Sequence, residues 1–253
     1  MEATRTLTPF VPWVEHFRAG PARHEPLEKT IDWDVALALD ARTRRAFVRS
    51  FQRFELGESG DGTHLLALAK TAGDPVYTTA LGLLVKEEQK HSALFGRGLD
   101  HLGAPSLESH WTDVAFTGLR RLLGLRTEIA LFLIAESVAM GYFIALADHA
   151  PDPVLRGIGR RIADDERNHI RFQIDRLRWG FRRTPAPVRA VIGAAWTLIA
   201  LGAATVLVVD HGAALRACGV APSEYWGRAM RSFRAAARSA LAPQEGALLG
   251  PLR

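Results

Sequence analysis

Apolar residues recur at helical spacing along most of the chain, and the breaks in that pattern mark the expected elements. A stripe that includes Phe47, Phe51 and Leu65 predicts one long helix over residues 41–72. Asp40, directly before this helix, is a suitable N-cap for it. Long helices separated by turns therefore set the fold class, which we expect to be all-α.

Two short turns of the same kind divide the central part of the chain. Each contains an Asp-Pro pair, and proline is tolerated in the first turn of a helix but not in its interior. The stretch between the two hairpins, 103–124, is much longer and includes a short helical segment over about 112–123. The pattern predicts a four-helix bundle in which this stretch crosses from one hairpin to the other. The remaining bundle helices are expected over 75–102, 125–149 and 153–179.

Both ends of the chain lie outside the bundle, which we place at residues 37–182. Residues 1–36 lack sustained periodicity and are expected to form an arm that packs over the domain without chemistry of its own. Residues 183–253 predict further helices over 187–215 and 223–241, which pack on the bundle or on a partner subunit.

The first of these C-terminal helices contains twenty residues, 190–209, without a charge, which reaches the length of a transmembrane segment. Its glycines and many alanines lower its hydrophobicity, and it follows a bundle of soluble character. We therefore favour a helix buried against the bundle or a dimer partner over membrane association through 190–209. Asp210 and His211, at the end of the run, are interpreted as capping residues rather than parts of a site.

Composition narrows the function classes. The chain has 253 residues, 48% of them hydrophobic, and a formal charge of +5, with enough apolar material for one large core. Its arginines are scattered among acids and apolar residues, so we interpret most of them as solvated helix faces and do not favour nucleic-acid binding. Cys218 is the only cysteine, which excludes a disulfide framework or a four-cysteine metal site within one chain. The N-terminus lacks the apolar run of a secretory signal, so a cytoplasmic location is expected.

A carboxylate and an imidazole three residues apart occur twice, at 88–91 and at 166–169. Such an E-x-x-H pair projects from one face of a helix. The two copies are 78 residues apart, and the same offset aligns Glu58 with Glu136 and one Asp-Pro-Val turn with the other. Because no gap is needed, the chain contains a duplicated structural unit.

Counting residues from each turn selects the carboxylates that lie level with these motifs. Glu58 is 16 residues before Asp74 and Glu88 is 14 after it, which places them about 24 and about 21 Å from the bend. Glu55 is nearly a turn too far out, and its repeat partner is Leu133. The same counts hold in the second unit. The predicted ligand residues are Glu58, Glu88, His91, Glu136, Glu166 and His169.

Four carboxylates and two imidazoles inside a bundle need protons or cations, because desolvating even one unpaired carboxylate is costly. Two divalent metal ions would satisfy them. Mixed oxygen and nitrogen ligands without a thiolate suit iron or manganese and argue against a closed structural zinc site.

The set of one glutamate on each outer helix and one E-x-x-H motif on each inner helix resembles the ferritin-like di-iron carboxylate superfamily, over about residues 41–180. The resemblance implies two iron ions, or manganese and iron, with Glu88 and Glu166 bridging them and dioxygen as co-substrate. It also implies an external electron donor and a homodimer. Asp165 and Glu87, which occupy equivalent positions of the repeat, are expected to accept hydrogen bonds from the histidines of the opposite hairpin.

Two local features depart from a plain bundle of this kind. Asn168 precedes the second histidine, where many members of the superfamily have arginine. Gly57, Gly60 and Gly62 surround Glu58, although each glycine in a helix interior costs about 1 kcal/mol relative to alanine. The glycines indicate either a pocket or π-bulge beside the metals, with room for substrate, or close packing of helices.

Together these features predict a dioxygen-activating di-iron, or manganese/iron, oxidase or oxygenase. Its substrate would be a small organic molecule, with hydroxylation, desaturation and N-oxygenation all open. The alternatives are a ferroxidase or iron-storage function like that of bacterioferritin, a di-iron enzyme that hydroxylates a tRNA base, and a scaffold. The additional helices disfavour a storage cage, and the presence of all six ligand-type residues makes a scaffold the least favoured.

Overall fold

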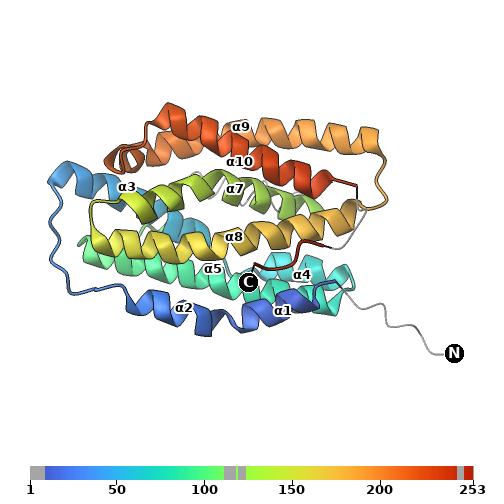
Figure 1. The fold of residues 1–253 in the computed structure, drawn as a ribbon, viewed down its shortest axis with the longest axis horizontal. Helices are drawn as coiled ribbons and strands as arrows, with labels where there is room; N and C mark the ends of the chain where they lie inside the picture. Colours follow the sequence, from blue (N-terminus) through green and yellow to red (C-terminus); the bar gives the residue numbers. More distant parts are fainter. Residues whose placement is uncertain (1–8, 111–117, 119–123, 244–247, 253) are drawn as a thin grey trace.

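A computed structural model describes residues 9–110, 118, 124–243 and 248–252, and every regular element within these ranges is an α-helix (Figure 1). The fold of the described chain is therefore all-α, as the apolar periodicity predicts. The long helices lie side by side along the long axis of the molecule (Figure 1). The short helix expected over 112–123 lies outside the described residues, apart from residue 118.

Both Asp-Pro turns begin a helix where the sequence predicts one. α5 (Pro75–His101) starts after Asp74, whose carboxylate accepts the Tyr77 N–H at 2.9 Å. α8 (Pro153–Phe181) starts after Asp152, whose carboxylate accepts two backbone N–H groups of the first turn. A side-chain cap and a first-turn proline together reduce the number of N–H groups left without a partner. The predicted starts of these two helices are confirmed.

The prediction of one helix over residues 41–72 is wrong. The structure has two helices here, α3 (Ala41–Glu58) and α4 (Thr63–Thr71), separated by a four-residue break. α3 does begin after Asp40, whose carboxylate caps its first turn. The break makes Glu58 the last residue of a helix instead of a residue in its interior.

Glycine accounts for the break. Gly62 has a φ of 66°, in the left-handed region that residues with a side chain rarely adopt. A Cβ at Gly62 would also lie 2.7 Å from a methyl carbon of Val85. Gly57 and Gly60 differ, because nothing lies within 4 Å of a Cβ built on either of them. Close packing of helices therefore does not explain these two glycines.

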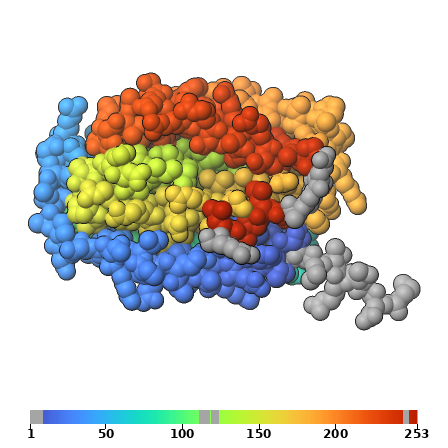
Figure 2. Space-filling view, viewed as in Figure 1, coloured from blue at the N-terminus to red at the C-terminus, as the bar shows by residue number. Residues whose placement is uncertain are grey.

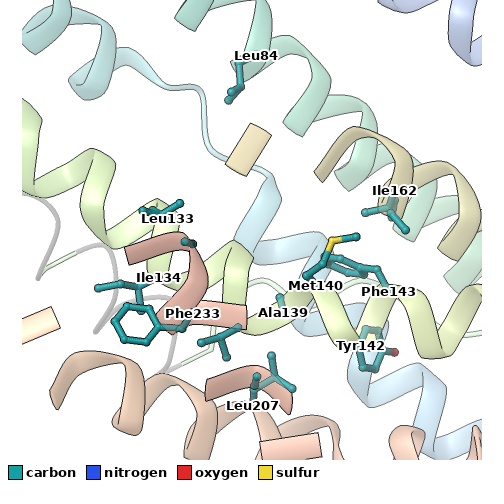
Figure 3. Packing of buried hydrophobic residues seen from close by; sticks show 14 of the residues in the cluster. Leu84, Leu133, Ile134, Ala139, Met140, Tyr142, Phe143, Ile162, Leu207 and Phe233 are labelled. Atoms are coloured by element: carbon teal, nitrogen blue, oxygen red, sulfur yellow. The ribbon is translucent and has the colours of Figure 1, made fainter. Parts of the chain in front are cut away.

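α7 (Leu125–His149) is the central helix, with the predicted bounds. A helix that is apolar on most sides is typical of a protein core. α7 packs most extensively on α8, where a Cβ at Gly159 would lie only 2.6 Å from the backbone nitrogen of Ala147. The two helix backbones therefore approach to a distance that only glycine permits. Figure 3 shows α7 side chains packed among residues of its neighbours: Leu133, Ile134, Ala139, Met140, Tyr142 and Phe143, with Leu84, Ile162, Leu207 and Phe233 around them.

The helices pack in two pairs. α3 packs on α5, α7 packs on α8, and the pairs meet through α5 and α8. The two E-x-x-H motifs therefore lie on the helices through which the pairs meet.

The N-terminal arm contains two helices that the sequence does not predict, α1 (Val11–Arg18) and α2 (Gly20–Lys29). Trp13 and Phe17 each pack edge-on against Phe172 of α8, with ring centroids 5.4 Å apart in both cases. α1 packs on α5 and α2 packs on α8, along one long edge of the molecule (Figure 1). The arm packs over the bundle, as expected.

α9 (Ala186–Ala217) and α10 (Pro222–Leu241) lie together along the opposite long edge (Figures 1 and 2). One face of α9 packs on α3 and α7, with Trp196, Ala200 and Ala204 buried, whereas its other face is exposed. The expectation of a helix buried against the bundle therefore holds for one face only. Within the described residues, α7 and α9 are the two helices long and apolar enough to cross a membrane by length and composition.

Asp175 of α8 joins the first and the last described stretches of the chain. Its Oδ2 accepts the indole N–H of Trp13 at 2.9 Å and the Gly250 N–H at 2.9 Å, while its Oδ1 accepts the Leu249 N–H at 2.7 Å. Burial raises the pKa of Asp175, although these hydrogen bonds oppose the rise. α1 and residues 248–252 are therefore held by one buried carboxylate.

Candidate metal centre

Four helices bring the six predicted ligand residues together. One donor atom from each residue of the two E-x-x-H motifs lies within 4.8 Å of the corresponding atoms of the other three. Glu58 of α3 and Glu136 of α7 line the same cavity as the two motif glutamates. Their role as metal ligands stays a prediction. We call the set the carboxylate–histidine cluster; it comprises Glu58, Glu88, His91, Glu136, Glu166 and His169.

His91 of α5 connects two acids of α8. Its Nε2 lies 2.9 Å from Oδ2 of Asp165, and its Nδ1 lies 3.4 Å from Oε1 of Glu166. The ring and both partner carboxylates are almost completely buried. A hydrogen bond from Nε2–H to Asp165 fixes the tautomer and directs Nδ1 into the cluster.

His169 of α8 has the reciprocal arrangement with α5. Its Nε2 lies 3.1 Å from Oε2 of Glu87, and its Nδ1 lies 2.7 Å from Oε1 of Glu88. The hydrogen bonds that the sequence predicts between each histidine and an acid of the opposite hairpin are therefore both present. The rings of His91 and His169 face each other at 5.4 Å between centroids, with 30° between their planes.

Burial and mutual repulsion set the protonation of the acids. Burial raises the pKa of Glu58 well above its ordinary value, and the charge of Glu88 raises it further. Burial and the charge of Glu166 raise the pKa of Glu136 in the same way. Burial would also raise the pKa of Glu88, but a hydrogen bond from Glu58 and the nearby His169 hold it at about 2. The environment therefore favours the neutral form of Glu58 and the ionised form of Glu88.

The imidazoles carry the compensating positive charge. Burial acts to lower the pKa of His91, but hydrogen bonds to Asp165 and Glu166 outweigh it and raise the pKa to about 9. The pKa of His169 is raised well above its ordinary value, because the charge of Glu88 and hydrogen bonds to acids outweigh burial. The cluster therefore requires positive charge, which protons or metal cations can supply.

Several buried polar atoms of the cluster make no hydrogen bond of good geometry, even where a donor and an acceptor lie close together, as Nδ1 of His169 and Oε1 of Glu88 do at 2.7 Å. Such atoms cost free energy unless a well-placed proton donor or a cation satisfies them. Carboxylate oxygens combined with imidazole nitrogens, without a thiolate, suit iron or manganese. The residues present therefore fit a pair of such ions. The atoms concerned are Oε1 of Glu88, Oε2 of Glu136, both carboxylate oxygens of Glu166, and Nδ1 of His91 and of His169.

The N-terminal arm contributes a residue that sequence analysis missed. His24 of α2 is buried, and its Nε2 lies 2.7 Å from Oδ1 of Asp165. The guanidinium of Arg161, also fully buried, donates to Oδ2 of the same carboxylate. Burial would raise the pKa of Asp165, but the hydrogen bonds from His24 and His91 outweigh it and hold the pKa well below its usual range. Asp165 is therefore an anion held by three cationic or proton-donating groups.

Neither residue has a counterpart in the duplicated pattern. His24 lies in a stretch without periodicity, and the position equivalent to Arg161 is Leu83. His24, Glu87 and Asp165 also lie close enough together to hold a metal ion. However, Asp165 already pairs with a guanidinium, and both acids accept hydrogen bonds from histidines of the cluster. We therefore assign this outer group to orienting the histidines.

A cavity of about 420 Å³ adjoins the cluster between α3, α7 and α9. Its size and mainly apolar walls are typical of a site for a small molecule. A second cavity of about 260 Å³ also adjoins Glu58 and is lined by Gly57, Gly60 and Gly62. The space predicted beside Glu58 is therefore present. The apolar walls of the larger cavity include Phe54, Leu131, Phe132, Phe143, Ile199 and Leu207.

Arg53 of α3 and Asp210 and His211 of α9 also line the larger cavity. Nε of Arg53 lies 3.5 Å from Oδ2 of Asp210, and Oγ of Ser50 lies 2.7 Å from Nδ1 of His211. Burial, and then the charge of Arg53, lowers the pKa of His211 to about 3, so this imidazole is neutral at pH 7. The expectation that Asp210 and His211 cap a helix is wrong, because α9 continues beyond them.

Comparison of the chain with known protein families, with curated proteins and with solved structures finds no match.

Proposed function

We propose that the chain is a dioxygen-activating oxidoreductase that holds two iron ions, or manganese and iron, in a ferritin-like four-helix bundle of α3, α5, α7 and α8. The observation that carries the proposal is the reciprocal orientation of the two histidines. Each directs Nδ1 into the cluster, while an acid from the opposite helix pair holds its Nε2. An imidazole fixed in this way by a second hydrogen bond is prepared to bind a metal.

Each part of the site has a distinct task in this proposal. Glu88 and Glu166, on the inner helices, lie between the two helix pairs and would bridge the ions. When bound there, the ions supply activation of dioxygen with electrons from an external donor. The apolar walls of the larger cavity hold an organic substrate beside Glu58 and Glu136 and exclude water from it.

The cavity favours oxidation of an organic substrate over iron storage. A ferroxidase passes hydrated ions to and from its centre, which calls for polar walls. The larger cavity is instead mainly apolar and of the size of a small-molecule site. Hydroxylation, desaturation and N-oxygenation all remain candidate reactions.

Metal analysis tests the centre. Wild-type protein from cells grown with iron and manganese is expected to hold about two ions per chain. The double variant Glu88→Ala/Glu166→Ala is expected to hold none and still fold, because removing two carboxylates relieves repulsion; circular dichroism checks the folding. Glu55→Gln is the matched control, since Glu55 lies one turn from Glu58 and binds the Ser106 hydroxyl at 2.7 Å. Equal metal content in wild type and double variant would sink the proposal.

Oxygen consumption separates an oxidase from a storage protein. Chemically reduced wild-type protein is expected to consume dioxygen faster when small apolar substrates are added, and Glu88→Ala/Glu166→Ala is expected to lose that response. Consumption that tracks only added ferrous iron, without a product from any organic substrate, would instead support a ferroxidase.

A further inference from the structure

The outward face of α9 is apolar, and none of the described residues covers it. Val191, Leu198 and Val209 are 71%, 72% and 74% exposed. At 3.6 residues per turn they lie within about 20° of one line along the helix, and this line is about 27 Å long. Residues 190–209 carry no charge. We call the line of exposed residues that includes Val191, Leu198 and Val209 the α9 stripe.

Core packing explains the hydropathy of α7 but not that of α9. Their most apolar windows have nearly equal mean hydropathy, 2.1 and 2.2. In α7, 78% of that window is buried inside the protein, whereas in α9 the share is 22%. A row of exposed, uncharged and largely apolar residues of this length marks an interaction site.

The positive charge of the chain is concentrated in the same region. Residues 182–253 contain nine arginines and three acidic residues, a formal charge of +6, while the whole chain carries +5. Residues 1–181 therefore carry −1. Arginines also precede and follow the uncharged run of α9: Arg182, Arg183, Arg189 and Arg216.

α10 adds an exposed row of arginines beside α9. They project from the side of α10 opposite its buried residues Tyr225, Met230 and Phe233. Within the described part of the chain, Arg228 alone among them has an ion-pair partner, Glu224. The four exposed arginines are Arg228, Arg231, Arg234 and Arg238.

We propose that α9 and α10 form a docking surface for an anionic lipid bilayer. Apolar residues flanked by arginines are typical of helices that lie in the boundary between headgroups and acyl chains. A second copy of the chain fits less well, because pairing two α9 stripes would bring two segments of +6 together. Trp226, whose indole N–H donates to Thr205 at 3.2 Å, lies at the seam of α9 and α10, and tryptophan favours this boundary.

α9 lies on the bilayer and does not cross it. Its inner face is part of the folded protein, since Trp196, Ala200, Ala204 and Leu207 are buried there. The same inner face lines the larger cavity through Ile199 and Leu207. A substrate dissolved in the lipid would therefore reach the cavity alongside α9; this last step rests on the proposed function, whereas membrane docking does not.

Vesicle flotation with the full chain tests the surface. Wild-type protein is expected to float with vesicles of phosphatidylcholine mixed with phosphatidylglycerol and to stay in solution with phosphatidylcholine alone. Raised salt should release it, because salt screens the arginines. Binding is measured without metal turnover, so its failure leaves the oxidase proposal untouched, and failure of oxidation leaves docking untouched.

Matched variants locate the contact. Leu198→Ser is expected to weaken binding about tenfold, whereas Ile144→Ser, at an exposed apolar residue of α7, should leave it unchanged. Arg231→Gln and Arg234→Gln should each weaken binding about fivefold. Three results would overturn the proposal: equal binding to both kinds of vesicle, no effect of Leu198→Ser, or a dimer in solution that Leu198→Ser dissociates. Salt-sensitive binding of RNA without binding of vesicles would overturn it as well.

Discussion

The two sides of the carboxylate–histidine cluster occupy equivalent positions of the repeat, but their backbones are held differently. Glu136 lies in the interior of buried α7, and its Oε1 accepts the side-chain N–H of Gln173 at 2.5 Å. Glu58 is the last residue of α3, is only partly buried, and lines both cavities. The duplication therefore supplies the same residue types twice, while the break in α3 opens one side. We expect substrate access and carboxylate movement on the Glu58 side.

The two acids that orient the histidines, Asp165 and Glu87, also occupy equivalent positions of the repeat but differ in their contacts. The carboxylate of Asp165 contacts the side chains of Arg161, His24 and His91. The carboxylate of Glu87 contacts His169 at 3.1 Å, and His24 lies further from it, at 3.8 Å. The acid on α8 is therefore part of a network that includes the N-terminal arm, and the acid on α5 is much less so.

Removal of the outer charges gives the largest expected difference. Asp165→Asn leaves the buried guanidinium of Arg161 with only the partly exposed carboxylate of Glu28, 3.1 Å from its Nε, as counter-charge, and is expected to lower the free energy of unfolding by about 3 kcal/mol. Glu87→Gln, the matched change, leaves no buried guanidinium behind and is expected to cost about 1–2 kcal/mol. Urea unfolding of metal-free protein at pH 7 measures both. Equal losses would remove the distinction between the two acids.

Glycine-to-alanine changes compare the helix backbones directly. Gly159→Ala places a methyl group against the backbone of α7 and is expected to lower the free energy of unfolding by about 3 kcal/mol. Gly57→Ala, at the end of α3, meets open space and is expected to raise it by about 0.5–1 kcal/mol. Thermal unfolding shows both signs. A stabilising Gly159→Ala would contradict the close approach of α7 and α8.

Low pH is expected to lower the free energy of unfolding through His211, which forms a hydrogen bond with Ser50 of α3, the helix that carries Glu58. The pKa of His211 is about 3 when folded and 6.5 in the ordinary state. Between these values the unfolded chain binds a proton that the folded chain does not, so stability falls as the pH falls below 6.5. The contribution at pH 5 relative to pH 8 is about 2 kcal/mol. His211→Gln should lack this part of the loss in urea unfolding; an identical pH profile would exclude His211 as its source.

The sequence predicts the helix starts and the cluster because both depend on short-range patterns. Asp74 and Asp152 act as caps within one turn of the backbone, and the 78-residue offset pairs Glu58 with Glu136 without knowledge of the fold. The break after Glu58 could not be predicted in this way, since apolar residues such as Leu65 continue the helical spacing beyond it. The left-handed backbone conformation at Gly62 separates α3 from α4. Because glycine adopts positive and negative φ about equally readily, its presence in the sequence does not show which φ it has.

Long-range contacts account for what the sequence left open. His24 reaches Asp165 across more than half of the chain, and no local pattern distinguishes it from the other histidines. Asn168, which stands where many members of the resembled superfamily have arginine, accepts the Leu252 N–H at 2.8 Å. The guanidinium that donates to Asp165 comes instead from Arg161. The apolar run of α9 is evident in the sequence, but which of its faces the protein covers depends on the packing of α3 and α7.

Two backbone amides near the end of the chain form hydrogen bonds with the carboxylate of Asp175, so they can report on the position of the N-terminal arm. The amide protons of Leu249 and Gly250 share this acceptor with the indole of Trp13, on the helix that precedes His24. Their exchange with deuterium is expected to be slow while Asp175 stays buried and bonded to Trp13 of α1, and to become faster when α1 detaches. An isotope measurement at one end of the chain therefore reports whether the arm at the other end is docked over the histidines.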